Sequence, residues 1–261
     1  MTNFKAIIEY DGTDFAGFQW QHQTRTVQGV LEDAIALRTG KAIRVSGAGR
    51  TDAGVHGLGQ VVSFQAETTI PVDRMAYALN SALPPDLSVR SVEAVDDSFH
   101  ARFSASSRVY LYLVLNRRTP SALWRRYSAF QWHPLDVEAM RNAAGRLVGE
   151  HDFAALANEL KPDEPTVRDM TRCEVAKRGD FLLMRFEANA FLRGMVRNTV
   201  GTLIEVGAGK RAPEDINAIL ESRDRRQAGP SAPAQGLCLI KVRYGTRKHN
   251  PRRWKQSEEN S

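Results

Sequence analysis

The sequence predicts an α+β protein made of two ferredoxin-like halves, each with an antiparallel sheet that helices cover on one face. Segments in which apolar and polar residues alternate, as in strands, are interleaved with segments whose apolar residues recur every three or four positions, as in helices. In each half these segments follow in the order β-α-β-β-α-β, which leaves the second face of each sheet for a ligand. No repeat is visible residue by residue, so the predicted duplication concerns topology alone.

The first half contains four expected strands and two expected helices. Thr26 is the expected N-cap of the first helix, Pro71 starts the second, and Pro84 and Pro85 end it. The strands are expected at 4–10, 42–46, 60–66 and 87–95, and the helices at 27–35 and 71–81.

The second half begins with the most regular strand, at 108–116, where Tyr110 and Tyr112 face one way and four apolar residues face the other. The later elements are expected as helices at 136–148 and 191–206, a short helix that starts at Pro213, and strands at 171–177, 181–188 and 236–244. Polar and small residues near 98–107 separate the halves, so we expect domains at 1–103 and 104–255 and a disordered tail at 256–261.

Length and cysteine content indicate the kind of protein. A chain of 261 residues can form one large domain or two modest ones without disulfides. Cys173 and Cys238 each lie in an apolar alternating run, so we expect buried thiols in a reducing compartment. No apolar run is long enough to span a membrane, and residues 1–10 lack the features of a signal peptide. These observations predict a cytoplasmic protein with no membrane partner.

The charge favours a polyanionic partner. The chain has 36 Lys and Arg against 30 Asp and Glu, for a formal net charge of +6. Arginines cluster at 117–118, 125–126, 223–226 and 247–255, the last together with Trp254. Guanidinium groups bind phosphate bidentately and stack on bases, so the clusters favour a nucleic-acid backbone.

A glycine-rich stretch at 45–60 holds five of the 19 glycines. At that density the backbone adopts conformations that a Cβ would forbid, or passes close to something bulky. The stretch also holds one acid, Asp52, with Arg50 two residues before it and His56 four residues after it. The carboxylate is either a catalytic group or ordinary turn chemistry, since Asp before small residues is common in turns.

Several other motif classes are excluded. The stretch at 47–49 lacks the third glycine and the following helix of a dinucleotide-binding fingerprint. No Walker loop and no serine-hydrolase elbow is present. The six histidines form no close pairs with acids or cysteines at metal spacing, so we expect no metal site and favour structural or RNA-facing roles.

Gly49-Arg-Thr-Asp-Ala-Gly-Val-His56 closely resembles the signature of the tRNA pseudouridine synthase A family. Further blocks resemble those of the same family in the same order, so the resemblance covers nearly the whole chain. They are Glu9-Tyr-Asp-Gly12, Phe15-Ala-Gly-Phe-Gln19, Phe99-His-Ala-Arg-Phe-Ser104, Val109-Tyr110, Asn189-Ala-Phe191 with Met195-Val-Arg-Asn198, and Gly236-Leu237.

The resemblance implies two ferredoxin-like, RNA-recognition-like domains, and a homodimer that binds the anticodon arm of tRNA in basic clefts. The implied reaction converts uridines at tRNA positions 38 to 40 into pseudouridine. Because the uracil leaves C1′ through N1 and rejoins it through C5, no atoms enter or leave. Neither a redox carrier nor another cofactor is therefore expected.

The resemblance also assigns the catalytic residues. Asp52 is expected to be the ionised carboxylate that attacks the sugar or the base, or that stabilises the departing uracil. Arg197 is expected to pair with it, and Leu237 to form the apolar floor of the pocket. Tyr110 is expected to stack on the target base, with a hydroxyl that assists loss of the C5 proton. Without the resemblance, Arg197 would be interpreted as an exposed helix residue and Tyr110 as a half-buried strand residue.

Five further residues are expected to bind the substrate RNA. Arg50 and Arg102 are expected near the flipped nucleotide, where they pair with phosphates or fill the space that the base vacates. His100 belongs to the same block as Arg102. Phe99 and Phe103, on either side of Arg102, either stack on bases or brace the junction between the halves.

Two alternatives to a cofactor-independent RNA isomerase remain open. A non-catalytic RNA-binding module would bind without producing a modified base, but a carboxylate repels phosphate, so such a module has reason to avoid Asp52. A tRNA nuclease would cleave the chain, but nothing in the sequence supplies its metal site. Val109 and Leu111 also depart from the family, which often has basic residues on both sides of its tyrosine, so some RNA affinity or positioning is expected to be lost.

Overall fold

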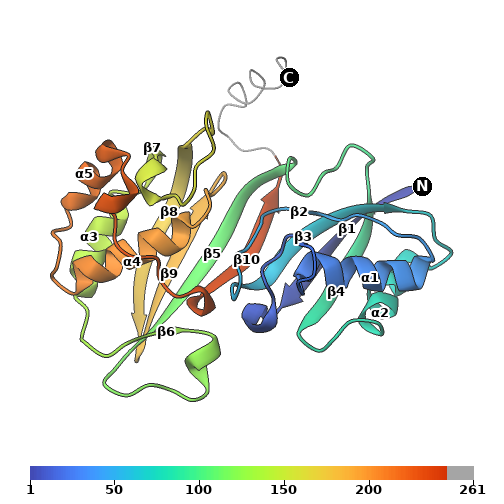
Figure 1. The fold of residues 1–261 in the computed structure, drawn as a ribbon, viewed down its shortest axis with the longest axis horizontal. Coiled ribbons are helices and arrows are strands. Elements are labelled where there is room, and N and C mark those ends of the chain that lie inside the picture. The colour runs from blue at the N-terminus through green and yellow to red at the C-terminus, as the bar shows by residue number, and fades with distance from the viewer. Residues whose placement is uncertain (246–261) are drawn as a thin grey trace.

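One continuous sheet runs through residues 1–245, the part of the chain that the computed structural model describes (Figure 1). Its 10 strands include the path β4-β1-β3-β10-β5-β9-β8-β7, with β2 paired to β3 and β6 paired to β5. The strands are β1 (Thr2–Tyr10), β2 (Ser46–Gly47), β3 (His56–Ala66), β4 (Leu87–Val95), β5 (Ala105–Asn116), β6 (Ala129–Gln131), β7 (Gly149–Asp152), β8 (Val167–Arg178), β9 (Phe181–Ala188) and β10 (Leu237–Tyr244). The tail expected at 256–261 lies outside the described residues.

The strand order confirms the ferredoxin-like organisation of the two halves. In the first half, β4 pairs with β1, β1 with β3, and β3 with β2, all antiparallel. In the second half, β10 pairs with β5, β5 with β9, and β9 with β8, again antiparallel. The four strands of the ferredoxin-like pattern are β1 to β4 in the first half and β5, β8, β9 and β10 in the second. In both halves the fourth lies beside the first, the first beside the third, and the third beside the second.

The helices connect these strands in the predicted order. The α-helices are α1 (Val27–Thr39), α2 (Val72–Asn80), α3 (Val137–Gly145), α4 (Met195–Gly207) and α5 (Asp215–Ser222). The 3-10 helices are η1 (Gly12–Asp14), η2 (Trp124–Arg126), η3 (Ala154–Leu156), η4 (Arg225–Gln227) and η5 (Ala234–Gly236). The side chain of Thr26 accepts a hydrogen bond from the Gly29 amide and caps α1 as expected.

The last strand joins the two halves. β10 pairs in parallel with the start of β3, with Cys238 opposite His56 and Leu239 opposite Gly57. Because the edge of a sheet presents unpaired N–H and C=O groups, the edge of β3 can accept β10 where β2 does not cover it. The two sheets expected from the sequence are thus parts of one sheet.

The pocket that contains Asp52, Tyr110 and Arg197 lies on the helix side of the sheet, whereas the sequence was expected to leave the opposite face for a ligand. The middle strands β3, β10 and β5 run between α1 and α4, which lie over the outer parts of the two halves (Figure 1). Tyr112, on the same face of β5 as Tyr110, belongs to the core that α3 and α4 cover. A cleft lined by residues of both halves lies on this face of the sheet.

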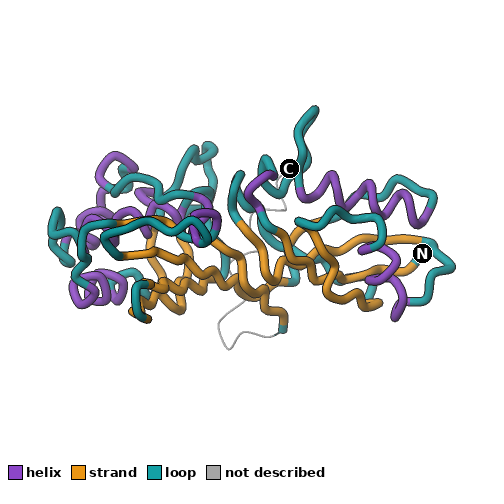
Figure 2. The backbone as a smooth tube through the Cα atoms, turned by 90° about the horizontal axis from the view of Figure 1, so that it is seen from below, coloured by secondary structure: helices purple, strands orange, loops and turns teal. Residues whose placement is uncertain are grey.

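Two apolar cores support this arrangement, and the edge-on view shows the strands as a continuous layer beneath most of the helical turns (Figure 2). One core lies between β1, β3 and the helices of the first half and includes Phe4, Ile8 and Leu31. The other fills the second half, but it also contains Ala48 and Val55 from the glycine-rich stretch. The glycine-rich stretch is therefore anchored in the core of the opposite half.

Several local features differ from the expectations. β6 and β7 were not predicted, and the strand expected at 42–46 is reduced to β2. α4 begins at Met195 and not at 191, because Gly194 has a φ of +72° and interrupts the helical backbone. Residues 189–194 form instead a turn that carries Phe191.

The two cysteines are free, Cys173 buried and Cys238 half-buried. Burial raises the pKa of both thiols, that of Cys238 to about 11, as expected for thiols within a core. No helix within residues 1–245 is both long and apolar enough to cross a membrane.

Candidate active site

The glycine-rich stretch forms a loop between β2 and β3 that lies over the centre of the sheet. The Ala48 amide donates to the Val61 carbonyl at 2.8 Å, and the Gln60 side chain donates to the Gly49 carbonyl at 2.7 Å. The Val55 amide closes a turn by donating to the Asp52 carbonyl at 3.1 Å. These bonds hold the backbone on both sides of Asp52.

Glycines of an earlier segment allow this loop to pack closely. A Cβ at Gly12 would lie 2.0 Å from the Val55 carbonyl oxygen. Gly17 has a φ of +99°, and a Cβ there would lie 2.8 Å from the Thr51 carbonyl oxygen. Any side chain at either position would displace the loop, so the glycines at 12 and 17 position the carboxylate of Asp52 indirectly.

The predicted ion pair between Asp52 and Arg197 is present. Arg197 Nη1 lies 3.1 Å from Asp52 Oδ2, and the two side chains are 23% and 35% exposed. Arg197 comes from the first turn of α4, and its Nε also donates to the Ala232 carbonyl at 2.7 Å. Two points of attachment thus hold the guanidinium beside a carboxylate that remains accessible from the cleft.

Tyr110 lies buried next to this pair. A Cβ at Gly49 would lie 3.7 Å from the Tyr110 hydroxyl, and the Phe191 ring meets the Tyr110 ring edge-on with centroids 5.1 Å apart. Burial raises the pKa of Tyr110, the Asp52 charge raises it further, and the Arg108 charge opposes both. The hydroxyl is therefore protonated at neutral pH.

Leu237 also lines the cleft and is buried. It lies opposite Tyr112 in the pairing of β10 with β5. The Tyr112 hydroxyl donates to the Pro233 carbonyl at 2.7 Å, next to the residue that binds Arg197. The residues before β10 are thus held by both Tyr112 and Arg197.

The other predicted residues are divided between the cleft and the rest of the molecule. Arg50, His100, Arg102 and Phe103 line the cleft. The His100 ring accepts a hydrogen bond from the Arg102 amide at 3.1 Å and lies 4.5 Å from the Phe103 ring. Phe99 is not among the lining residues. Its ring packs against Tyr244 with centroids 5.0 Å apart, as expected for a residue that braces the junction.

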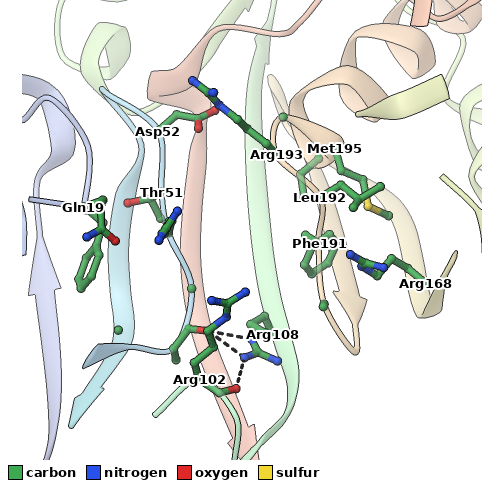
Figure 3. Close-up of a pocket in the computed structure, with 18 of the residues that line it drawn as sticks. Gln19, Thr51, Asp52, Arg102, Arg108, Arg168, Phe191, Leu192, Arg193 and Met195 are labelled. Atoms are coloured by element: carbon green, nitrogen blue, oxygen red, sulfur yellow. Dashed lines mark hydrogen bonds between the residues drawn. The ribbon is translucent and has the colours of Figure 1, made fainter. Parts of the chain in front are cut away.

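Arg108 is a positioning residue that the sequence did not single out. Its Nη2 donates to the carbonyls of Ala48 and Arg102 at 2.8 and 2.6 Å, and its Nη1 to that of Asn189 at 2.7 Å (Figure 3). One buried guanidinium thus connects the glycine-rich loop, the segment between the halves, and the turn before Phe191. The only signal in the sequence is a charged residue at the start of an apolar strand.

The cleft itself has a volume of about 2490 Å³. Gln19, Thr51 and Asp52 lie on one wall, and Phe191, Leu192 and Met195 on the opposite wall (Figure 3). Its basic lining residues are Arg50, Arg102, Arg108, Lys161, Arg168, Arg193, Arg197 and Arg225. Its acidic lining residues are Asp52, Glu150, Glu159, Asp163, Glu164 and Asp169. Pockets for small molecules measure about 300–1000 Å³, so the size suits part of a larger ligand, and the basic residues are in the majority. Among residues 1–245, no group of three His, Cys, Asp or Glu side chains is arranged to hold a metal ion.

A model of the tRNA pseudouridine synthase family matches residues 6–104 and 143–245. The chain belongs to this family. Asp52, Arg197 and Leu237 lie within the matched ranges, and Tyr110 lies between them.

Individual relatives agree with this assignment. Proteins named tRNA pseudouridine synthase A from Thermoanaerobacter sp. (strain X514), Brevibacillus brevis and Pseudothermotoga lettingae are 44%, 45% and 43% identical to the chain. Each alignment covers 94% of this chain and 100% of the relative. The resemblance inferred from the motifs is confirmed, and because pseudouridine synthases are isomerases, the chain is an isomerase.

Proposed function

We propose that the chain converts uridine to pseudouridine at positions 38 to 40 in the anticodon arm of tRNA, with Asp52 as the nucleophile and without a cofactor. The observation that carries this proposal is the ion pair of Asp52 with Arg197 in a basic cleft, beside a buried tyrosine. The tRNA substrate is supported by the family match and by the names of the relatives.

The lining of the cleft supports RNA as the substrate. Arginines on both walls can neutralise phosphates, which supply most of the affinity in protein–nucleic acid complexes. A base stacked in a helix does not present its reacting atoms to a side chain, so the target uridine would be flipped out of its helix. Leu237 and Tyr110 offer the flipped base an apolar floor and an aromatic ring.

The reaction needs one bond exchange at C1′. The glycosidic C1′–N1 bond breaks, the uracil turns, and a C1′–C5 bond forms; C5 loses a proton, and N1 ends with one. Asp52 would act through its carboxylate oxygens, by attack on the sugar or the base or by stabilising the charge that develops. Arg197 stabilises the charge of that carboxylate and fixes its direction.

Tyr110 would contribute its ring and a neutral hydroxyl. Because burial raises its pKa, the phenolate form is rare at neutral pH. The neutral hydroxyl would therefore accept the C5 proton only while it gives its own proton to another acceptor. It would not act as a phenolate base.

Release of tritium from tRNA labelled at C5 of uridine tests the proposal. Asp52→Asn is expected to abolish release and to keep the affinity for tRNA close to that of the wild type, because the arginines of the cleft remain. Retained release by this variant would overturn the role of Asp52. Binding by the wild type without any release would indicate an RNA-binding module, and cleaved tRNA on a gel would indicate a nuclease.

We also propose a homodimer in the cytoplasm, on the basis of the family resemblance. Sedimentation velocity at several protein concentrations tests the oligomeric state, and cell fractionation tests the location. A monomer at all concentrations would contradict the first part of this proposal.

A further inference from the structure

Arg168 lies near the start of β8, and in Figure 3 it lies on the side of Phe191 away from Asp52. The Asp169 amide donates to the Asn189 side chain at 3.1 Å, and the Asn189 amide donates to the Asp169 carbonyl at 3.1 Å. These two bonds tie β8 to the turn that carries Phe191. The guanidinium of Arg168 points from β8 toward Phe191 and lines the cleft (Figure 3).

This guanidinium is buried without full hydrogen bonding. Arg168 is only 6% exposed, and its Nε has no hydrogen-bond partner. Its Nη1 donates to the carbonyls of Pro165 and Val167, both in its own segment. Leaving a donor of a buried cation unpaired is costly, and a bound anion or water molecule can lower that cost.

No carboxylate neutralises Arg168 directly within residues 1–245. Burial lowers the pKa of Arg168, and the charges of Glu164 and Asp152 oppose that shift only in part. Asp152 forms its ion pair with Arg223. The Glu164 carboxylate accepts a hydrogen bond from the Lys161 amide. Arg168 therefore lines the cleft without a direct ion pair among residues 1–245, and the charges of Glu164 and Asp152 act on it from a distance.

We propose that Arg168 binds one backbone phosphate of the RNA strand that carries the reacting uridine, on the side of Phe191 away from Asp52. This inference rests on the proposed function, because it requires RNA in the cleft. A phosphate oxygen would accept a hydrogen bond from Nη2, because Nε is enclosed by protein and Nη1 already donates to Pro165 and Val167, and it would bring a negative charge to the guanidinium. The contact fixes the position of the strand and carries no sequence preference.

The salt dependence of tRNA binding tests the proposal. For the wild type and Arg168→Gln, the dissociation constant for the same tRNA transcript is measured over a range of KCl concentrations. Loss of one phosphate contact is expected to weaken binding about tenfold. It is also expected to lower the slope of log affinity against log salt by about 0.7 to 0.9. Thermal denaturation of each variant shows whether it is folded.

Arg185→Gln is the matched control. Arg185 lies on β9 of the same sheet, and its Nε also has no hydrogen-bond partner, but it does not line the cleft. The proposal predicts that Arg185→Gln keeps the wild-type slope and affinity. An equal loss of affinity and slope in both variants would show that removing any arginine charge weakens tRNA binding to this extent. It would overturn the specific role of Arg168.

Single methylphosphonate substitutions along the anticodon arm locate the contact. One neutralised phosphate is expected to weaken wild-type binding and to have no further effect in Arg168→Gln. If Arg168→Gln does not fold, Arg168→Lys takes its place, and the effect at that phosphate is expected to shrink. A wild-type slope in the variant, or equal effects at every phosphate, would refute the inference while leaving the proposed function intact. A wild-type protein that does not bind tRNA would refute the proposed function itself.

Discussion

Replacing Arg197 with glutamine separates what its ion pair with Asp52 does for folding from what it does for catalysis. The charged atoms are 3.1 Å apart, and the Asp52 side chain is 35% exposed. Coulomb's law gives about 1.3 kcal/mol at this distance in water and about 5 kcal/mol at an effective dielectric constant of about 20. Because exposed pairs contribute about 0–1 kcal/mol, we expect the lower figure to apply. With the bond to the Ala232 carbonyl, the free energy of unfolding is expected to fall by about 1–2 kcal/mol.

The effect on catalysis is expected to be much larger. A preorganised charge beside the reacting group is typically worth about 10²–10³ in kcat. Arg197→Gln should therefore lower kcat by about that factor, while KM for tRNA changes little because the other arginines of the cleft remain. Arg197→Lys should recover only part of the loss, because an ammonium group lacks the planar fork that reaches both Asp52 and the Ala232 carbonyl.

Steady-state tritium release over a range of tRNA concentrations gives kcat and KM, and urea unfolding gives the change in stability. Arg211→Gln is a matched control, because Arg211 pairs with Glu205 at 2.5 Å and these side chains are 26% and 23% exposed. The control is expected to lose a similar amount of stability and to keep its kcat. A kcat within about threefold of the wild type in Arg197→Gln would refute the role that we assign to the ion pair.

Three further predictions concern the supports of the site and its pH dependence. Gly17→Ala forces a Cβ against the glycine-rich loop at a φ of +99°, and should cost roughly 1–3 kcal/mol in urea unfolding. Gly40→Ala, which also has a positive φ but nothing within 4 Å, should cost less, and the reverse order would contradict the argument. Arg108→Met leaves four backbone carbonyls without their donor and should cost roughly 3 kcal/mol, with lower activity at temperatures where the variant remains folded. Burial raises the pKa of Tyr10 and Tyr110 above the 10.0 of a free tyrosine, so the stability that they contribute is complete below pH 10 and is lost as the pH rises through their folded-state values. Urea midpoints that do not fall between about pH 9 and about pH 12 would contradict this assignment.

The strands that the sequence predicted well are those with one buried face. β9 alternates strictly between half-buried and buried residues, so its apolar pattern was visible in the sequence. The position of β10 between the halves was not visible, because both edges of a strand present the same backbone groups. Only the exposed edge of β3, formed by residues 182 positions earlier in the chain, decides which neighbour β10 has on that side.

Local sequence patterns also predict the candidate active site only in part. The pairing of Asp52 with Arg197 was expected from the family motifs, and no local pattern connects two residues that are 145 positions apart. Arg108 and Arg168 went unnoticed because a single arginine in a strand usually faces solvent. Their burial depends on carbonyls and turns from other segments, which the spacing of residues within one strand does not reveal.

The parallel pairing of β10 with β3 has a consequence for biosynthesis. Ribosomes make chains from the N-terminus, so the segment that bridges both lobes is the last of the described strands to emerge. Until it inserts, Leu237, which we propose as the floor under a flipped base, is not in place, and a nascent chain presents two unfinished lobes with open edges. Acquisition of activity should therefore coincide with one late docking event.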